Sequence, residues 1–515
     1  MTEKNRLGSS VPSDKWLIVI LLIVVGIILW NSRSSLLPTQ EGYTRGNEDY
    51  IYSTFFGGSS SDQIRDVVLD SEGNIIIVGG TFSSDLPVKN ANQATYGSGD
   101  IPEEEWFTEE AWFWLMGDGF VVKFSPEHDL KWSTYIGGSD REIANHVVLD
   151  SDDNILVFGR TLSDDFPVTD ESSFSGSENG DAFIVRFTPN GQVIDSRYYA
   201  GRERVYIKDV GKDLEGNIVL AGETTSRGYQ CTEDAAQSSL GGEADGFIRV
   251  LTEDLDAMAY STLIGGGAVD GIGDISVDAD GDIYASGYTQ SIDLPVTDDA
   301  RFPDYRGGSR DGFILKMGAY GQFELLTYLG GSDQDDVFGL ATDVEGSEIV
   351  VVGRTRSVDF PVTGDEFQGK EIDLEVDGFL STLSPDGELL RSTRFGLNNW
   401  DSLIQVDVDE EKRAIITGFV LSSGFETANA FQSDFQGGSD IIVIVRGDEN
   451  ELLSYLGGFS TEHPFGQCIS DGRIYLVGTT ASQEFPVSDD AFQQDYGGCE
   501  DGILWIIDYK AYMAR

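Results

Sequence analysis

The chain has 515 residues, of which 89 are Asp or Glu and 34 are Lys or Arg, so its formal net charge at pH 7 is −55. A surface this acidic repels phosphate backbones, which argues against nucleic acid as a partner and suits high salt, divalent cations or basic ligands. The hydrophobic fraction of 40% and the aromatic fraction of 11% are sufficient for a packed interior, so the composition excludes intrinsic disorder.

Near the start of the chain, residues 16–30 read WLIVILLIVVGIILW and are apolar without interruption. As a helix they reach about 22 Å, which is short of the roughly 30 Å hydrocarbon core, so flanking residues or local thinning must help them to span it. Tryptophan at both ends is typical of a membrane interface and favours a retained transmembrane anchor. The alternative is a secretory signal cleaved at the small residues that follow.

Basic residues precede this apolar segment at Lys4, Arg6 and Lys15. The positive-inside rule therefore predicts a short cytoplasmic tail at 1–15 and an acidic body outside the cell membrane. Residues 31–49 are polar and lack periodicity, so we expect a tether there. With a retained anchor the protein is single-pass, and with a cleaved signal it is secreted.

The rest of the chain is an array of similar units. The clearest marker is a glycine that recurs at spacings of 80, 63, 65, 66, 65 and 60 residues, a period typical of stacked supersecondary units. The seven positions are Gly79, Gly159, Gly222, Gly287, Gly353, Gly418 and Gly478.

Each unit contains four short strand candidates, A to D in chain order, which in the second unit are 145–150, 154–161, 181–187 and 194–200. The A-to-B links, such as DSEGN and DADGD, carry Asp early and Gly late, as tight antiparallel hairpins require. Strand B is apolar at successive positions, so both of its faces are expected to be covered, as when sheets stack around an axis. Its recurring glycine then marks a close backbone approach or a bulge.

The order of the strands predicts how the array closes. A D-type segment, YIYSTFF at 50–56, comes before any strand A, and the chain ends on a strand C. We therefore predict an all-β fold over 50–515: a seven-bladed β-propeller of four-stranded antiparallel blades, in which the strand at 50–56 completes the last blade.

The segments WSTYIGG, LDSDDNILVFGRT, SDDFPV and DAFIVRF resemble the seven-bladed β-propeller repeat family (SBBP-type repeats) of bacterial and archaeal surface proteins. The resemblance extends over nearly all of 50–515. It implies an exported or surface protein and brings no shared catalytic motif with it. The third unit, with SRGYQCT, and the sixth, with SSGFETA, depart from the Pro-Val element.

In such a propeller the D-to-A and B-to-C connections emerge on one face, and here these are the long ones. That face is the expected working face. Converging carboxylates there suit a hard cation such as Ca²⁺ or an acid and base pair for glycoside cleavage, and the alternative is that they only form turns. The candidate binding residues are Asp62, Asp140, Arg141, Glu203, Asp270, Asp335, Asp336, Asp401, Glu462 and His463.

A second set of carboxylates, Asp278, Asp280 and Asp282 in DADGD, resembles the start of a calcium loop. The twelfth position holds Thr289 where an EF-hand supplies Glu, and the same slot recurs as DSEGN, which favours a hairpin turn. Calcium is therefore the one cofactor considered, and no metal site is assigned firmly.

The aperiodic stretch 99–117, GDIPEEEWFTEEAWFWLMG, is an aromatic and acidic insertion in the first unit. Its rings either form a contact surface for a partner, a glycan or the bilayer, or bury one another over the rim. The rings are Trp106, Phe107, Trp112, Phe113 and Trp114.

The sequence contains no nucleophile elbow, zinc-protease motif, phosphate-binding loop or dinucleotide fingerprint, which weighs against an enzyme without excluding one. Our leading hypothesis is a membrane-anchored extracellular scaffold that binds a protein or surface polysaccharide through its long-loop face. The alternatives are a glycan-cleaving hydrolase or lyase with carboxylates at the channel mouth, and a passive structural protein of the cell envelope.

Overall fold

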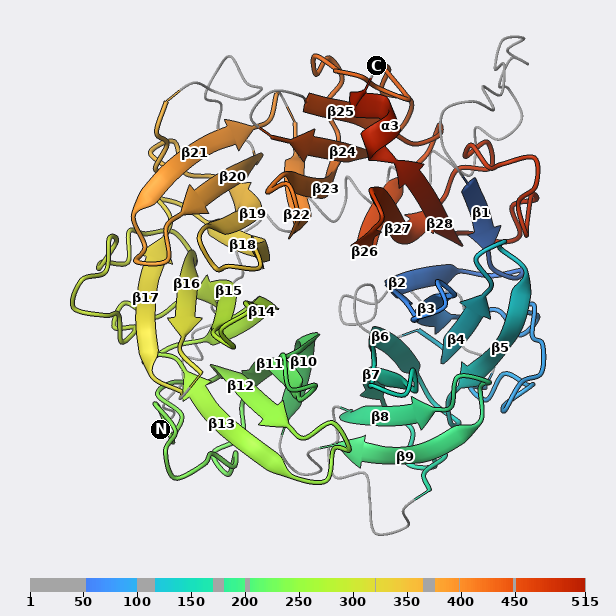
Figure 1. Ribbon diagram of the computed structural model, residues 1–515, viewed down its shortest axis with the longest axis horizontal. Helices are drawn as coiled ribbons and strands as arrows, with labels where there is room; N and C mark the ends of the chain where they lie inside the picture. Colours follow the sequence, from blue (N-terminus) through green and yellow to red (C-terminus); the bar gives the residue numbers. More distant parts are fainter. Residues whose placement is uncertain are drawn as a thin grey trace, which may run out of the picture. The chain divides into compact units, whose positions relative to one another are not determined.

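A computed structural model describes residues 52–99, 116–169, 180–199, 204–319, 321–364, 376–397, 399–447 and 451–514. These residues contain 28 strands, which form seven four-stranded antiparallel sheets arranged as blades around a central axis (Figure 1). In each blade strand A lies nearest the axis and strand D at the perimeter. The predicted all-β seven-bladed propeller is confirmed.

The strands follow the chain in simple order, with one exception in blade 7, whose outermost strand is the first strand of the chain. Blade 1 is β2 (Asp62–Leu69), β3 (Ile75–Thr81), β4 (Asp118–Phe124) and β5 (Leu130–Ile136); blade 2 is β6 (Glu142–Leu149), β7 (Ile155–Thr161), β8 (Asp181–Phe187) and β9 (Val193–Tyr199); blade 3 is β10 (Val205–Lys212), β11 (Ile218–Thr224), β12 (Asp245–Leu251) and β13 (Met258–Ile264); blade 4 is β14 (Asp270–Val277), β15 (Ile283–Thr289), β16 (Asp311–Met317) and β17 (Phe323–Leu329). Blade 5 is β18 (Asp335–Thr342), β19 (Ile349–Thr355), β20 (Asp377–Leu383) and β21 (Leu389–Phe395); blade 6 is β22 (Asp401–Val408), β23 (Ala414–Val420), β24 (Asp440–Arg446) and β25 (Glu451–Leu456); blade 7 is β26 (Glu462–Ser470), β27 (Arg473–Thr480), β28 (Asp501–Asp508) and β1 (Tyr52–Phe56), and a short helix α3 (Tyr509–Met513) follows β28.

The ring closes through β1, as the strand count predicts. This strand pairs antiparallel with β28 from Tyr52 opposite Ile506 to Phe56 opposite Gly502. The pairing gives the last blade its fourth strand and leaves neither β1 nor β28 with an unpaired inner edge.

The recurring glycine of strand B sits where strand A bulges, which confirms both parts of the prediction for it. A Cβ on Gly159 would lie 2.1 Å from the carbonyl oxygen of Ile143 and 2.4 Å from the ring of Phe183. The register of β6 against β7 shifts between Ala144 and His146 at this point. Only glycine leaves room for the bulged strand and the neighbouring ring together.

A tyrosine hydroxyl of strand D forms hydrogen bonds with the B-to-C connection of the same blade. Tyr135, at the end of WSTY, donates to the carbonyl of Ser83 at 2.9 Å and accepts from the N–H of Leu86 at 2.9 Å. Tyr198 makes the same two contacts in blade 2. Each hydroxyl thus fixes the B-to-C connection of its own blade against strand D.

The core lies between blades as well as within them. Val78 and Val121 of blade 1 pack in one cluster with Val147 and Val157 of blade 2, and all four are essentially inaccessible to solvent. Burial of both faces explains why strand B carries apolar residues without alternation.

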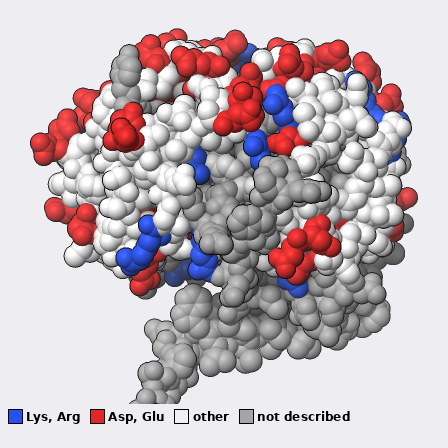
Figure 2. Space-filling model, turned by 90° about the horizontal axis from the view of Figure 1, so that it is seen from below, with Lys and Arg blue, Asp and Glu red and all other residues white. Residues whose placement is uncertain are grey.

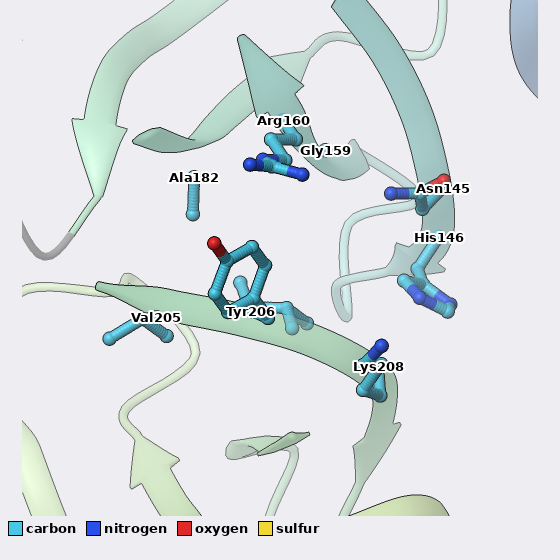
Figure 3. Close-up of a pocket in the computed structure, with 9 residues that line it drawn as sticks. Asn145, His146, Gly159, Arg160, Ala182, Val205, Tyr206 and Lys208 are labelled. Carbon is cyan, nitrogen blue, oxygen red and sulfur yellow. The ribbon is translucent and has the colours of Figure 1, made fainter. Parts of the chain in front are cut away.

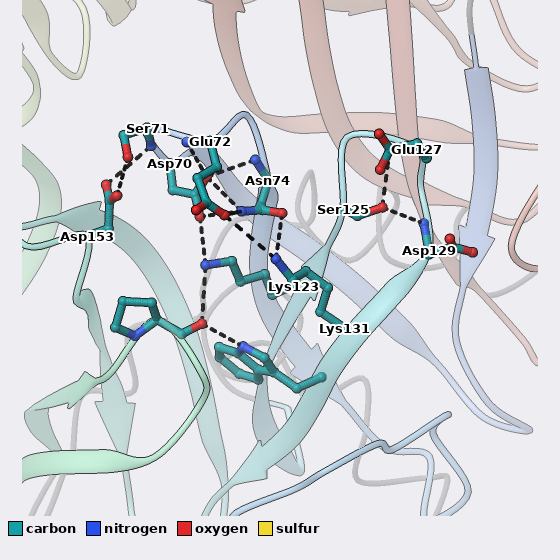
Figure 4. A network of polar contacts seen from close by, with 12 residues as sticks. Asp70, Ser71, Glu72, Asn74, Lys123, Ser125, Glu127, Asp129, Lys131 and Asp153 are labelled. Carbon is teal, nitrogen blue, oxygen red and sulfur yellow. Dashed lines mark hydrogen bonds and ion pairs between the residues drawn. The ribbon is translucent and has the colours of Figure 1, made fainter.

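The hairpin face is joined across blades by a polar network (Figure 4). Lys123 Nζ lies 2.6 Å from Asp70 Oδ2, and both side chains are 3% exposed. The same ammonium donates to the carbonyl of Pro189 in the next blade at 3.2 Å, as does Trp132 Nε1 at 3.1 Å. The tight turns on this face therefore stabilise the contact between neighbouring blades.

Within the part of the chain that the structure describes, we find no helix that is long and apolar enough to cross a membrane. The predicted tail at 1–15, anchor at 16–30 and tether at 31–49 lie outside the described residues, and so do the five aromatic residues of the insertion at 99–117. The anchor and the role of the insertion stay predictions.

Candidate functional site at the channel mouth

Five of the predicted rim carboxylates begin a strand A and lie inside the wall of the rim. Asp62 is fully buried; Thr81 donates to its Oδ1, and the hydroxyl of Ser83 and the N–H of Gly58 donate to its Oδ2 at 2.8 and 2.7 Å. Equivalent serine and backbone donors serve Asp270, Asp335, Asp401 and Glu462. These carboxylates fasten the D-to-A loop to the end of strand B.

Glu142 occupies the same position in blade 2, and the sequence analysis missed it. It accepts from Thr161 at 2.6 Å and from the N–H of Gly138 at 3.1 Å. Counting five residues from the IGG turn's first glycine would have identified it in place of its neighbours Asp140 and Arg141. Asp140 is exposed and caps its own turn through the N–H of Arg141 at 2.9 Å.

Burial shapes the ionisation of these groups. It raises the pKa of Asp62 and of Glu462 to about 7 and that of Glu142 to about 8, against the opposing effect of their hydrogen bonds. It raises the pKa of Asp335 and of Asp401 to about 6. The rim therefore contains several carboxyl groups that stay protonated at pH values well above the usual pKa range of Asp and Glu.

Of the remaining predicted rim residues, Glu203 lies outside the described residues. Asp336 is 2% exposed and lies between two guanidinium groups described below. His463 packs edge-on against Phe419, with 5.2 Å between ring centroids, and burial lowers the pKa of this imidazole to about 4.

The DADGD carboxylates build the predicted hairpin turn. Asp278 accepts from the N–H groups of Asp280 and Asp282 at 2.9 and 3.0 Å and from the hydroxyl of Tyr284 at 2.9 Å. Asp282 pairs with Lys316 at 2.8 Å. In the described ranges no three or more His, Cys, Asp or Glu side chains gather as a metal would require.

The mouth of the channel on the long-loop face is lined from three positions: the residue after the recurring glycine of strand B, and the second and fourth residues of the strand A that follows it around the ring. A cation and a ring meet there repeatedly, as in Arg160 over Tyr206, where the guanidinium carbon lies 4.7 Å from the ring centroid. With the side chains that bridge these positions, we name this set the channel belt: Gln63, Arg65, Arg160, Tyr206, Lys208, Glu223, Tyr288, Arg310, Asp336, Phe338, Arg354, Trp400, Phe419, His463 and Phe465.

From blade 3 to blade 5 the belt is a chain of alternating charges. The hydroxyl of Tyr288 donates to Glu223, and Arg310 lies 5.0 Å above the Tyr288 ring. Arg310 also pairs with Asp336, to which Arg354 Nε donates at 2.8 Å. Asp336 is therefore held between two cations within the belt.

From blade 5 to blade 7 aromatic rings prevail. Arg354 lies 5.1 Å from the ring of Phe338 and 5.2 Å from that of Trp400, which is 39% exposed. On the far side, Arg65 lies 4.1 Å from the ring of Phe465. Half-exposed rings beside guanidinium groups provide flat apolar faces and fixed donors together.

The charge of the belt contrasts with that of the whole chain. It contains five Arg or Lys residues against Glu223 and Asp336, and Glu500 lies beside it, where its Oε2 accepts from Gln63 Nε2 at 3.4 Å; the whole protein has a formal charge of −55. Figure 2 shows the outer surface from one side, where Asp and Glu crowd along the upper edge and far outnumber Lys and Arg there. The mouth is thus a more basic zone within an acidic body.

One pocket opens in the belt, between blades 2 and 3 (Figure 3). Arg160 lies above Tyr206, while His146, Asn145 and Lys208 approach from the other side. Burial lowers the pKa of His146 and of Lys208, and the nearby positive charge of Arg160 lowers that of Lys208 further, against the opposing charge of Glu223.

Below the belt, the fifth residue of strand A joins neighbouring blades. Asp66 accepts from the N–H of Val147 at 2.9 Å, Asp209 from Ile275 at 2.9 Å, and Gln405 Nε2 donates to the carbonyl of Phe465 at 2.7 Å. Burial raises the pKa of Asp66 to about 7. These bonds hold the innermost strands together beneath the mouth.

The fold and this mouth define the class of protein: a seven-bladed β-propeller in which repeated residues build the blades and unrepeated ones line the channel. Residues 131–167 match the family model described as "Beta-propeller repeat" (SBBP), which confirms the resemblance seen in the sequence. No curated protein matches the chain.

Solved propellers resemble the chain in fold alone. The Dos1 propeller is 7% identical, with a TM-score of 0.37 over 88% of this chain and 94% of that one. Sqt1 from Chaetomium thermophilum is 10% identical, with a TM-score of 0.38 over 89% and 99%. The acylaminoacyl peptidase of Pyrococcus horikoshii is 10% identical, with a TM-score of 0.38 over 84% of this chain and 52% of its own, so this chain spans about half of it.

Proposed function

We propose that this protein is a membrane-anchored, exported propeller that binds its partner through the channel mouth of the long-loop face, with residues 16–30 as the anchor. One observation carries the proposal. The positions that repeat from blade to blade all serve the fold, whereas the position after the recurring glycine of strand B changes from blade to blade and lines the belt. Its occupants are Gly80, Arg160, Glu223, Tyr288, Arg354, Phe419 and Thr479.

The chemistry of the belt favours holding a ligand over cleaving one. A glycoside hydrolase needs two carboxyl groups that face the substrate. The oxygens of Asp62 and Glu462 instead accept hydrogen bonds from hydroxyl and N–H groups of the rim. Arginine beside a half-exposed ring, as at Arg354 and Trp400, is the arrangement found at binding hot spots.

The proposed partner is on the exterior, either a protein or a surface polysaccharide; the basic residues before the apolar segment support this, because the positive-inside rule then predicts a propeller outside the membrane. Digestion of intact cells by an added protease tests this placement. Cleavage of the propeller with survival of the tail supports it, and full protection of the propeller contradicts it.

The binding experiment uses the full-length protein in detergent, presented to surface polysaccharides and envelope proteins with and without Ca²⁺. Trp400→Ala and Arg354→Gln should each weaken capture by about tenfold or more, because hot-spot truncation commonly costs at least this much. Leu214→Ala is the matched control, since Leu214 is 70% exposed on an A-to-B turn of the opposite face. Formation of a product would favour the hydrolase or lyase instead. If neither a ligand nor a product is found, the passive structural protein is favoured.

A further inference from the structure

Arg356 is an exposed arginine beside the channel belt. It directly follows β19, and its backbone N–H donates to the carbonyl of Gln334 at 2.9 Å. Its guanidinium carbon lies 5.8 Å from the ring centroid of Trp400, and among the described residues this guanidinium has no carboxylate partner. The repeat does not require a charge here, because the equivalent position of every other unit holds an uncharged residue: Phe82, Leu162, Thr225, Gln290, Leu421 and Ala481.

Two exposed carboxylates lie in the described loops on either side of Arg356, and both have other partners. Asp333 accepts from the next N–H of its own loop at 2.8 Å. Asp359 accepts from the N–H of Ser332 at 2.7 Å and lies 3.7 Å from the guanidinium of Arg306. The positive charge of Arg356 is therefore available to the carboxylate of a ligand.

Two partly exposed apolar side chains adjoin this charge. Trp400 is 39% exposed and Leu421 is 37% exposed, and the N–H of Leu421 donates to the carbonyl of Trp400 at 3.1 Å. The indole N–H of Trp400 donates to Ser402 Oγ at 3.1 Å, which fixes the orientation of the ring. The other guanidinium near this ring belongs to Arg354, whose Nε donates to Asp336. The surface therefore combines fixed apolar side chains with one cation that lacks a counter-charge within the described residues.

The polar groups around this surface favour a peptide over a sugar. A bound sugar ring buries hydroxyl groups, each of which needs a hydrogen-bond partner. The amide of Asn399 already donates to the carbonyl of Leu421 at 3.2 Å, and the amide of Gln334 donates to a carboxylate of the belt at 2.9 Å. Leu421 itself offers only an aliphatic surface. An apolar side chain beside a carboxylate matches this arrangement better, because the first covers Trp400 and the second pairs with Arg356.

We propose that Arg356, Trp400 and Leu421 form the docking site for an acidic peptide segment of a protein partner, in which an apolar side chain stands next to Asp or Glu. The apolar side chain packs on Trp400 and Leu421, and the carboxylate binds the planar guanidinium of Arg356 through two N–H donors. Physiological salt screens exposed charges beyond about 8 Å, so the distant acidic surface weakens this contact little. The inference deepens the proposed function, on which it rests, by choosing a protein over a polysaccharide as the partner.

The test is fluorescence polarisation of the full-length protein in detergent with labelled pools of dodecapeptides. The first pool has Leu or Phe between two Glu residues at its centre, with random flanks. The second pool has Gln in place of both Glu residues, and the third has Ala in place of the Leu or Phe. A labelled oligomer of galacturonic acid is the fourth probe and represents an acidic polysaccharide. The first pool should bind about tenfold more tightly than the other probes, because it alone supplies both contacts.

Arg356→Gln and Trp400→Ala should each weaken binding of the first pool by about tenfold or more. Arg356→Gln should melt at the temperature of the parent protein, since within the described part of the chain the guanidinium forms no hydrogen bond that the fold needs. Arg356→Lys keeps the charge without the planar fork and should restore only part of the affinity. Arg301→Gln is the matched control, because Arg301 is 54% exposed and lies 3.7 Å from Glu388, between strands C and D of blade 5.

Equal binding of the first and second pools, or binding of the first pool that survives both Arg356→Gln and Trp400→Ala, overturns the docking site. Tighter binding of the galacturonic acid oligomer than of every peptide pool overturns the choice of a protein and leaves the proposed function standing with a polysaccharide as the partner. If no probe binds while Trp400→Ala still weakens capture of an envelope partner, the docking site alone is overturned. Capture that neither Trp400→Ala nor Arg354→Gln weakens overturns the proposed function of the belt.

Discussion

The backbone N–H of Ser53 donates a hydrogen bond of 2.9 Å to the hydroxyl of Ser488, a residue 435 positions later in the chain. The N–H of Ser488 returns a bond of 3.0 Å to the carbonyl of Ser53. The first described strand is therefore tied both to its neighbour β28 and to the B-to-C connection of the same blade.

Deletion of residues 50–56 should abolish the single cooperative melt of the propeller. Blade 7 would lose its outer strand, and the two flanking cores would lose Phe55 and Phe56, each 1% exposed. Differential scanning calorimetry is the measurement, and deletion of residues 35–41, in the predicted tether, is the control. A melt unchanged by the first deletion would contradict the closure.

Most of the architecture could be predicted from the sequence because the glycine of strand B and the order of the four strands recur in all seven units. A single glycine in a strand is ambiguous, whereas seven at the same place require one physical cause, which is the bulge opposite Gly159 and its equivalents. The strand count likewise left only one partner for residues 50–56.

The candidate site could not be predicted in the same way, because the carboxylates that repeat from unit to unit form hydrogen bonds that stabilise the fold. Asp62 and Glu462 attract attention by recurring, yet they are buried among serine and threonine hydroxyls. Trp400 recurs in no other unit and the arginine at the position of Arg160 recurs only as Arg354, and only the closed ring shows that these residues line one mouth. A comparison of the units position by position would have shown the variation next to the invariant glycine.

Gly159→Ala should destabilise the propeller by about 3 kcal/mol, because the added methyl group has no space between the bulged backbone and the ring of Phe183. Gly364→Ala is the matched control, since nothing lies within 4 Å of its Cβ position. The measurement is the free energy of unfolding of each variant, obtained from urea denaturation. Equal values for the two variants would show that the bulge can relax at little cost.

Lys123→Met should cost about 3–5 kcal/mol, because it leaves Asp70 buried beside an apolar chain. Lys131→Met removes an ammonium from the same face that is 40% exposed, and should change the stability by no more than about 0.5 kcal/mol. Burial alone would raise the pKa of Asp70, but hydrogen bonds from Lys123 and Asn74 outweigh it and lower that pKa below its usual value. The loss caused by Lys123→Met should therefore shrink as acid protonates Asp70, and a loss that stays constant with pH would argue against the pair.

The melting temperature should rise when the pH is lowered from about 8 to about 5. In the unfolded chain Asp and Glu ionise near pH 4. In the fold, burial raises the pKa of Asp62, Asp66 and Glu462 to about 7 and that of Glu142 to about 8, so the folded state binds more protons across this window. Stability then falls as the pH rises through it.

The variant Glu142→Gln should show a flatter dependence of melting temperature on pH between about 5 and 8, since one of the groups responsible no longer titrates. Asp140→Asn, which changes an exposed carboxylate two residues away, controls for the change in net charge. A parent protein whose melting temperature climbs from pH 5 to pH 8 would contradict the raised pKa values.

The bond between β1 and β28 also means that the two ends of the propeller sequence meet in one sheet. In topological terms the seven blades form a circle that has been cut once, inside blade 7. A circular permutant that joins these ends and begins at another long connection would keep every blade contact, so the order of residues around the mouth is independent of where translation starts.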